Sequence, residues 1–353
     1  MAVEFVHLHV HTQFSFLIGT IKVNELASRA RQLKMPAVAT TDHHNMFGAI
    51  RHYNSCRKAG VRPILGSEVN VAMDSGGMAH LVLLAATNEG YQNLIRIVSR
   101  GYTQPASDAG PSVSFQEIAD RPKGLVALTG CMGGTVPQQV LEQGESRARP
   151  ALSLLKDAFE PGHLFVELQD HGLPEQAVLN GILESAARDL ELPLVATNDV
   201  HFMSKDDGQA QLYLDCVRLG RTYAEALPGH HGSFEMYLKS PAEMATVFPN
   251  HPEALKNTLR IAEMCSGLEL KLGTPMLPQF PVPPGYDANS YFRHLSREGL
   301  QQRLAHFRSL GKQVEEAAYR DRLEIELNVI IEMKYPGYFM FTITSSSRCK
   351  RWW

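Results

Sequence analysis

Short apolar runs rich in β-branched residues alternate with segments of helical period along the first part of the chain. Each run is short enough for a strand, and turn residues bound it. Seven strands are predicted, at Phe5–His11, Pro36–Asp42, Arg62–Val71, His80–Ala86, Gly124–Thr129, His163–Leu168 and Pro193–Thr197. Segments with helical periodicity lie between these strands, at Val23–Lys34, Met46–Ala59, Asn88–Arg100, Ser146–Phe159 and Glu175–Glu191.

Strands that alternate with helices predict an α/β fold with parallel pairing. Seven strands within about 200 residues favour a closed or nearly closed barrel over an open sheet. Polar residues also gather where strands end, as at His9 and His11, and barrel enzymes place their chemistry at such ends. Gly-rich phosphate-binding loops of the two common open-sheet types are absent from the sequence.

The composition changes near residue 270. The segment Thr274–Gly285 reads TPMLPQFPVPPG, and this density of proline predicts a stiff linker. Two helical segments follow, Ser290–Ser309 and Gln313–Glu332, and the latter has an amphipathic pattern. We therefore expect a barrel over residues 1–270, a linker over 271–285 and a separate helical part after it.

Charge and cysteine content limit the binding partners and the cellular compartment that the sequence predicts. The 34 basic and 37 acidic residues give a net charge of -3, so the chain has no bulk positive field to attract nucleic acid, although local basic patches stay open. The five cysteines include no CxxC pair, which favours a reducing compartment over a disulfide framework. No signal peptide and no membrane-length apolar run is evident, so we expect a soluble cytoplasmic protein.

The first candidate ligands are the histidines of His7-Leu8-His9-Val10-His11. Alternate residues of a strand share a face, so these side chains are expected to project the same way. Imidazoles at a strand end in a barrel mouth can share one metal ion. A single buried histidine is more often structural, but three at this spacing favour a metal site.

Two more clusters contain carboxylates. Asp42 precedes His43, and it could orient a neighbouring imidazole or cap the helix that follows. Glu68 stands in an otherwise apolar strand, where an unpaired carboxylate would be costly, so it should bind metal or pair with a cation. Glutamate can also bridge two metal ions.

The remaining candidates follow later strands. His80 opens one strand, and Cys131 follows another within Gly130–Gly134; alone, each would be interpreted as a structural residue. Asp199 and His201 share a face after the last strand. Together the six clusters predict a polynuclear centre for Zn²⁺, Mn²⁺ or Fe that hydrolyses a phosphate ester.

These stretches resemble the polymerase-and-histidinol-phosphatase (PHP) domain of bacterial DNA polymerase III alpha subunits. The resemblance rests on FVHLHVHTQFS, ATTDHHNMFGA, PILGSEVNV, HLVLLAATNEGYQNL, LTGCMGG, LQDHGLPEQ and LVATNDVHF. LEIELNVIIEMKYPGYF resembles the family segment that leads into the polymerase palm, which assigns residues 286–341 to the start of a palm.

The resemblance implies a distorted seven-stranded (β/α) barrel with two to three divalent metal ions. It implies one site at His9, His11, Glu68 and Asp199, which are also the expected catalytic residues. Glu68 then bridges to a second site with His80 and Cys131, and a third lies near His43 and His201.

Two positions depart from the family pattern. Ile18 stands where the family has an acidic ligand, so the third metal should bind weakly or not at all. After Phe339 the sequence no longer resembles the palm, and residues 342–353 match nothing in the family. We expect a truncated or frame-shifted relative, without its own polymerase site.

Three functions follow from the resemblance. The leading one is metal-dependent 3′–5′ hydrolysis of single-stranded DNA ends (proofreading) in DNA replication, with the rest of a replisome as partner. The second is a non-catalytic scaffold that stabilises the polymerase, favoured by the loss of a ligand at Ile18. The third is a histidinol-phosphatase-type phosphoesterase, which the palm-like segment disfavours.

Overall fold

The computed structural model describes residues 4–73, 76–108, 110–226, 233–273 and 279–349. Contacts within the chain divide it into two compact units, Met1–Leu270 and Lys271–Trp353. Part of the predicted Pro-rich linker, residues 274–278, lies outside the described residues.

One six-stranded sheet organises the first unit, and its strands are neighbours in the order of the sequence. The pairs β1–β2, β4–β5 and β5–β6 are parallel, whereas β3 is antiparallel to both β2 and β4. The strands are β1 (Ala37–Thr40), β2 (Arg62–Ala72), β3 (Met78–Ala85), β4 (Leu125–Leu128), β5 (Leu164–Leu168) and β6 (Leu194–Ala196).

The reversed direction of β3 differs from the parallel pairing that the strand–helix alternation predicts. A parallel connection needs a crossover of a dozen or more residues, and the link from Ala72 to Met78 is far too short for one. The reversal brings the start of β3 to the edge of the sheet where its neighbours β2 and β4 end. His80, near the start of β3, therefore lies beside the end of β2, where its register partner is Asn70.

The predicted first strand, Phe5–His11, is not a regular strand, but it closes the sheet. His7 O accepts the amide of Ala39 in β1 at 2.9 Å. On the other side, His9 O accepts the amide of Val200 and His11 N donates to Val200 O, at 3.0 and 2.7 Å. The segment thus bridges β1 and the chain that follows β6, and completes a distorted seven-stranded barrel.

The barrel interior is a packed apolar layer to which the first segment and all six strands contribute. Its members include Val6, Leu8, Ala39, Ile64, Val82, Val126, Phe165 and Val195, together with Ile261 and Cys265 from beyond the sheet. Strand alternation places Glu68, His80 and Glu167 on the same faces as Ile64, Val82 and Phe165. The polar centre therefore continues the interior layer along these strands.

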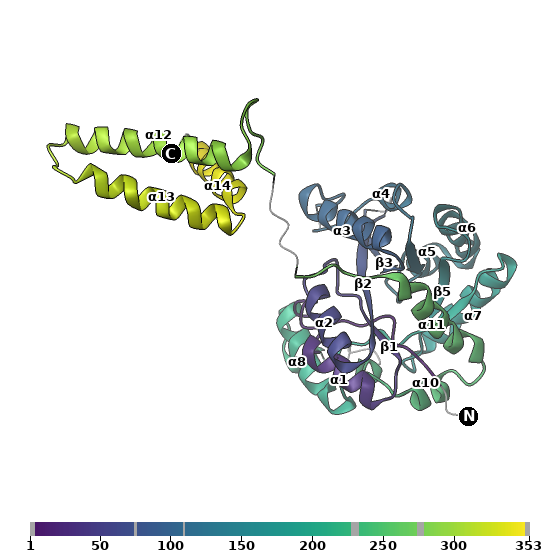
Figure 1. Ribbon diagram of the computed structural model, residues 1–353. Coiled ribbons are helices and arrows are strands. Elements are labelled where there is room, and N and C mark those ends of the chain that lie inside the picture. Colours follow the sequence, from purple (N-terminus) through teal and green to yellow (C-terminus); the bar gives the residue numbers. More distant parts are fainter. Residues whose placement is uncertain (1–3, 74–75, 109, 227–232, 274–278, 350–353) are drawn as a thin grey trace. The chain divides into compact units, whose positions relative to one another are not determined.

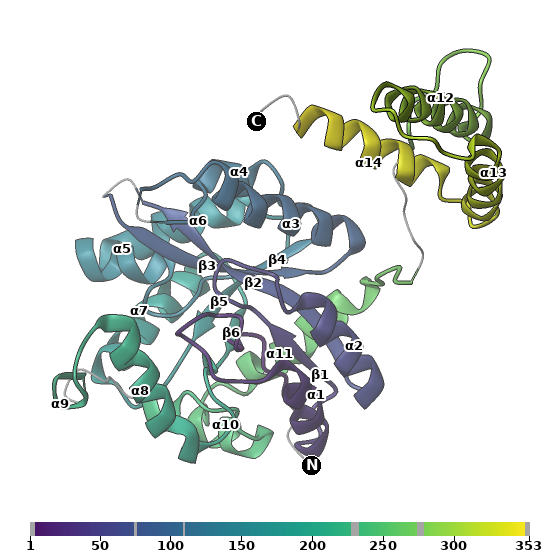
Figure 2. The same cartoon turned by 90° about the vertical axis from the view of Figure 1, so that its left-hand side faces the viewer.

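Helices surround the sheet (Figures 1 and 2). Those expected from the sequence are α1 (Val23–Gln32), α2 (Ala49–Ala59), α3 (Asn88–Thr103), α6 (Ala148–Ala158) and α7 (Pro174–Asp189). Those not predicted are α4 (Phe115–Ala119), α5 (Thr135–Gln143), α8 (Gly208–Leu219), α9 (Tyr223–Ala226), α10 (Pro241–Val247) and α11 (Pro252–Met264). Short 3₁₀ turns occur at Glu145–Arg147, Lys205–Asp207, Ser233–Glu235 and Cys265–Gly267.

The second unit is helical in its described residues. Helices α12 (Ala288–Ser309) and α13 (Glu316–Glu332) pack side by side, and α14 (Pro336–Cys349) contacts α12 (Figure 1). Phe292, Leu327 and Met340 form its small buried core, one residue from each helix. Among the described residues of the whole chain, no helix has the length and apolar character to cross a membrane.

Candidate metal centre

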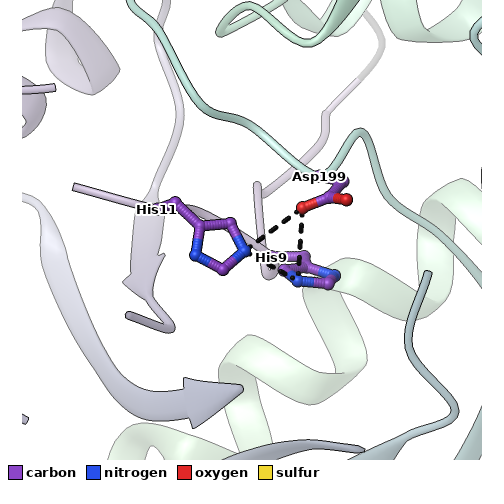
Figure 3. A group of neighbouring side chains, drawn as sticks. All are labelled: His9, His11 and Asp199. Atoms are coloured by element: carbon purple, nitrogen blue, oxygen red, sulfur yellow. Dashed lines mark hydrogen bonds and ion pairs between the residues drawn. The ribbon is translucent and has the colours of Figure 1, made fainter. Parts of the chain in front are cut away.

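Three imidazoles converge on one carboxylate oxygen, Asp199 Oδ1. The Nε2 atoms of His9, His11 and His201 lie 3.4, 3.3 and 3.1 Å from it. Figure 3 shows His9 and His11 turned toward Asp199 from the segment that closes the barrel. The Nε2 atoms of His9 and His11 are themselves only 3.2 Å apart.

The other nitrogen of each ring already has a partner that accepts a hydrogen bond. His9 Nδ1 lies 2.8 Å from Glu167 Oε1, and His201 Nδ1 lies 2.9 Å from the backbone carbonyl of Ile18. His11 Nδ1 lies 3.0 Å from Ser15 Oγ, whose own proton is directed to Asp42 at 2.7 Å. All three rings must therefore donate from Nδ1, which leaves a lone pair on each Nε2 unless that atom is also protonated.

Lone pairs that face one another and a carboxylate repel unless a positive charge lies among them. A proton or a metal ion can supply that charge, and His9, His11 and Asp199 are close enough to hold one ion. Their donor atoms all lie within 4.8 Å of one another. The residues present thus fit a divalent cation by the direction of their free electron pairs as well as by their types.

Glu68 organises a second group. Its Oε2 lies 2.8 Å from His43 Nδ1, and its Oε1 lies 2.9 Å from His80 Nδ1. Cys131 Sγ is 3.8 Å from both Glu68 Oε1 and His80 Nδ1. A thiol, two imidazoles and a carboxylate form a donor set that suits zinc and related transition metals.

Glu68 also reaches the first group. The Nε2 atoms of His9 and His11 lie 3.5 and 3.6 Å from its two carboxylate oxygens. One buried carboxylate therefore stands between both sets of ligands, which is the arrangement that a bridging glutamate requires.

The centre favours positive charge. Burial alone would raise the pKa of Asp199, but His9 and His201 hold it well below its ordinary value. Burial likewise opposes protonation of His9, yet the charges of Asp199 and Glu167 raise its pKa well above the ordinary value. Burial and the carboxylates of Glu68 and Asp199 raise the pKa of the Cys131 thiol, so a cation is needed to hold it as thiolate.

Sequence reasoning missed Glu167. This fully buried carboxylate on β5 accepts bonds from His9 Nδ1, from the amide of Gly130 at 2.9 Å and from Thr197 Oγ1. It thereby ties together the segments that carry His9, Cys131 and Asp199. The signal was present, since Glu167 interrupts the apolar run of its strand just as Glu68 does.

Asp42 acts on the centre through an intermediate residue. Its carboxylate accepts bonds from Thr12 N, Thr12 Oγ1 and Ser15 Oγ. Ser15 in turn accepts from His11 Nδ1 and from the amide of His43. The alternative role as a helix cap is wrong, because the residue that caps α2 is Gly48.

His7 lies apart from the cluster, contrary to the expected common face. Its Nε2 contacts Lys239 O at 2.8 Å, and burial lowers its pKa to about 4. The irregular backbone of the segment Phe5–His11 explains why His7 does not face the cluster. Leu8 belongs to the barrel interior and its neighbour His9 also faces inward, which a regular strand does not allow.

The remaining ligand positions differ in grouping from the family pattern. His43 contacts Glu68 and His80, whereas His201 contacts Asp199 and packs 4.5 Å from the ring of His11. A third site shared by His43 and His201 therefore stays a prediction. Ile18 contributes its carbonyl oxygen, which holds His201 and accepts a bond from Gln211.

Asp199 and His44 both occupy the left-handed region, with φ values of 43° and 47°. This conformation is unfavourable for residues other than glycine, and such strain gathers at functional sites. At Asp199 this backbone carries the side chain that faces the Nε2 atoms of His9, His11 and His201.

Residues 7–171 match the family model described as the PHP domain. Over these residues the first unit, a barrel with a histidine- and carboxylate-lined centre at one end, is similar to PHP domains. The chain is also similar to bacterial DNA polymerase III alpha subunits.

The similarity to these subunits covers nearly the whole chain. The DNA polymerase III alpha subunit of Pseudomonas aeruginosa is 37% identical over 97% of this chain, and that of Thermus aquaticus is 36% identical over 91%. The chain spans only about 30% of the length of these relatives, 30% and 27% respectively.

Among solved structures, a proposed metal-dependent phosphoesterase from Bifidobacterium adolescentis matches 56% of this chain and 88% of its own. Its sequence identity is 17% and the TM-score is 0.40, a likeness too distant to assign a function.

Proposed function

We propose that this centre binds two to three divalent metal ions, Zn²⁺, Mn²⁺ or Fe, and hydrolyses phosphodiester bonds at the 3′ ends of single-stranded DNA. The observation that carries the proposal is the convergence of three imidazole Nε2 atoms on Asp199 Oδ1, with Glu68 joining them to a second ligand group. Similarity to DNA polymerase III alpha subunits supports DNA as the substrate and DNA replication as the setting.

The chain's own residues would divide the work. His9, His11, Asp199 and His201 would hold one ion, and His43, His80 and Cys131 a second, with Glu68 between them. When bound, divalent ions supply Lewis-acid activation of water and neutralise charge on phosphate oxygens. Glu167, Ser15 and the Ile18 carbonyl fix the ring orientations through the Nδ1 atoms.

The test uses single-stranded DNA labelled at its 5′ end, incubated with the purified chain and Mn²⁺ or Zn²⁺. We expect products that shorten one nucleotide at a time from the 3′ end. A double variant, Glu68→Ala with Asp199→Ala, should be inactive. Equal activity of the wild type and this variant would overturn the proposal, because the product would then come from a contaminant.

A non-catalytic scaffold is the second candidate, and the loss of an acidic ligand at Ile18 favours it. In that case the chain stabilises the remainder of a polymerase, and residues 286–341 form the start of its palm. A chain that binds metal ions but cleaves neither DNA nor histidinol phosphate would support this role. Turnover of histidinol phosphate alone would instead indicate a small-molecule phosphatase.

A further inference from the structure

The metal centre opens to solvent on one side. The side chains of His43 and His80 are 25% and 28% exposed, whereas those of His9, His11 and Glu68 are 4% exposed or less. The rings of His43 and His80 lie 4.9 Å apart at this opening. A substrate therefore reaches the centre past His43 and His80, and the surface next to these two residues is where the rest of that substrate lies.

Exposed aromatic side chains lie on the loop that follows His43 and at the end of α3. Phe47, four residues after His43, is 69% exposed, and Tyr102 at the end of α3 is 49% exposed. Their ring centroids are 6.4 Å apart, and the ring of His44 lies 5.6 Å from that of Tyr102. Phe16, 81% exposed, belongs to the neighbouring loop that follows His11. We call the pair Phe47 and Tyr102 the aromatic edge.

Hydrogen bonds fix these two loops to each other and to the centre. Asn45 Nδ2 donates to Phe14 O and His43 O, at 2.9 and 3.0 Å, and Asn45 Oδ1 accepts the amide of Phe47. Ser15 Oγ accepts the amide of His43 at 3.0 Å. Phe47 is thus carried by the same loop as His43, and hydrogen bonds tie this loop to the one that follows His11.

Exposure this large is unusual for a phenylalanine, and burying the ring would be favourable if folding required nothing else. Exposed aromatic rings that follow a ligand of the proposed phosphoesterase centre match one way in which proteins bind single-stranded nucleic acid, by stacking bases on aromatic side chains.

We propose that the aromatic edge stacks the unpaired bases of single-stranded DNA next to the phosphodiester held at the metal centre. This inference rests on the proposed function, and it adds a base-binding subsite formed by Phe47 and Tyr102. It makes the substrate a polynucleotide rather than a small phosphate ester.

The test measures binding of a fluorescent oligothymidylate with phosphorothioate linkages, which resist cleavage, to the full chain by fluorescence anisotropy. Phe47→Leu and Tyr102→Leu keep an apolar side chain but remove the stacking surface. Each should raise Kd at least about fivefold, since one stacked base contributes roughly 1–3 kcal/mol. Phe47→Tyr keeps the ring and should bind like the wild type.

Two controls isolate stacking. Val178→Ala removes an apolar side chain of similar exposure, 66%, from α7 and should leave Kd unchanged. An abasic oligonucleotide of the same length should bind the wild type and Phe47→Leu equally. If the leucine variants bind oligothymidylate as tightly as the wild type, the base-binding subsite is wrong. It is also wrong if these variants lose as much affinity for the abasic strand as for oligothymidylate, because the edge then contacts the backbone or a protein partner.

The two proposals fail in different ways. Hydrolysis of an abasic oligonucleotide with ordinary phosphodiester linkages, which offers no base or other aromatic ring to stack, should be equal in the wild type and in Val178→Ala. If this hydrolysis is present but the leucine variants do not change oligothymidylate binding, only the subsite is overturned. If no hydrolysis occurs but the variants weaken binding, the subsite stands and the phosphoesterase function is overturned.

Discussion

At the scale of single residues, one oxygen atom organises most of the centre. Asp199 Oδ1 faces three Nε2 atoms whose rings are held from behind by Glu167, Ser15 and the Ile18 carbonyl. The hydrogen bonds behind the rings matter as much as the ligands, because they decide which nitrogen is free to bind a cation.

Glu167→Gln tests that role. The amide keeps the size of the side chain but removes the charge that favours a cation at His9, so metal affinity of the Asp199 group should fall about 10- to 100-fold. Competition with a chelator measures the loss. The matched control is Glu184→Gln, which removes the charge from another carboxylate–imidazole pair, Glu184 with His251 at 2.9 Å, and should leave metal binding unchanged. Equal affinity of both variants would contradict the role of Glu167.

The sequence alone was enough to place the ligand-type residues at strand ends, because histidines and carboxylates are costly to bury in apolar strands unless they have partners there. It could not show which residues share an ion. That depends on the irregular backbone at Leu8 and His9, which turns two consecutive side chains inward, and on the left-handed Asp199. Neither feature follows from strand alternation.

At the scale of elements, the contact between α3 and the turn before β4 is among the closest in the barrel. A Cβ added to Gly90 in α3 would lie 1.8 Å from the carbonyl oxygen of Gly124. The backbones of the two elements therefore meet with no space for a side chain.

Gly90→Ala should destabilise the chain by roughly 1–3 kcal/mol, although alanine favours helices, because the two elements must separate. Gly181→Ala in α7 is the matched control, since a Cβ there meets nothing within 4 Å. It should stabilise by up to about 1 kcal/mol. Chemical denaturation measures both, and a stable Gly90→Ala chain would show that α3 does not pack as described.

His52 on α2 makes the first unit sensitive to acid. Burial lowers its pKa from 6.5 to about 4, while its Nε2 bonds Val38 O at 3.0 Å. His52 takes up a proton near pH 6.5 in the unfolded chain but only near pH 4 in the folded chain. The neutral His52 therefore contributes to the free energy of unfolding above pH 6.5, and this contribution is lost as the pH falls to about 4. The loss is about 3 kcal/mol.

His52→Gln can still donate to Val38 O but does not titrate. Unfolding free energies measured from pH 7 to pH 4.5 should therefore fall less steeply for the variant than for the wild type. Parallel curves would mean that His52 is accessible to protons in the folded chain.

The strands could be predicted from their apolar runs, but the direction of β3 could not, because it depends on the length of the connection from Ala72 to Met78. Helix α11, whose Ile261 packs against the barrel interior, was also missed. Its signals, Pro252 at the first turn and apolar residues at helical spacing, are common in loops and helices alike until their partner is known.

At the scale of the whole molecule, the second unit exposes apolar side chains. Ile325 and Val329 of α13 and Met333, the residue just after it, follow one another at every fourth position and are 46–61% exposed. A stripe of this kind favours association with another apolar surface. The assignment of residues 286–341 to the start of a palm stays a prediction, and so does the unmatched tail.

We expect the isolated chain to self-associate through this stripe. Light scattering coupled to gel filtration should show a mass that rises with concentration, and Ile325→Lys with Met333→Lys should abolish the rise. Leu310→Lys, which changes an exposed leucine just after α12, should not abolish it. A wild-type chain that remains monomeric at all concentrations would contradict this expectation.

The measurement that tests the central claim most directly is the metal content of the purified chain. After loading with Zn²⁺ or Mn²⁺ and exhaustive dialysis, elemental analysis should find at least two equivalents in the wild type and almost none in the variant with Glu68→Ala and Asp199→Ala. A folded wild-type chain that retains no divalent metal would contradict the claim, because the convergent imidazoles would then be satisfied by protons alone.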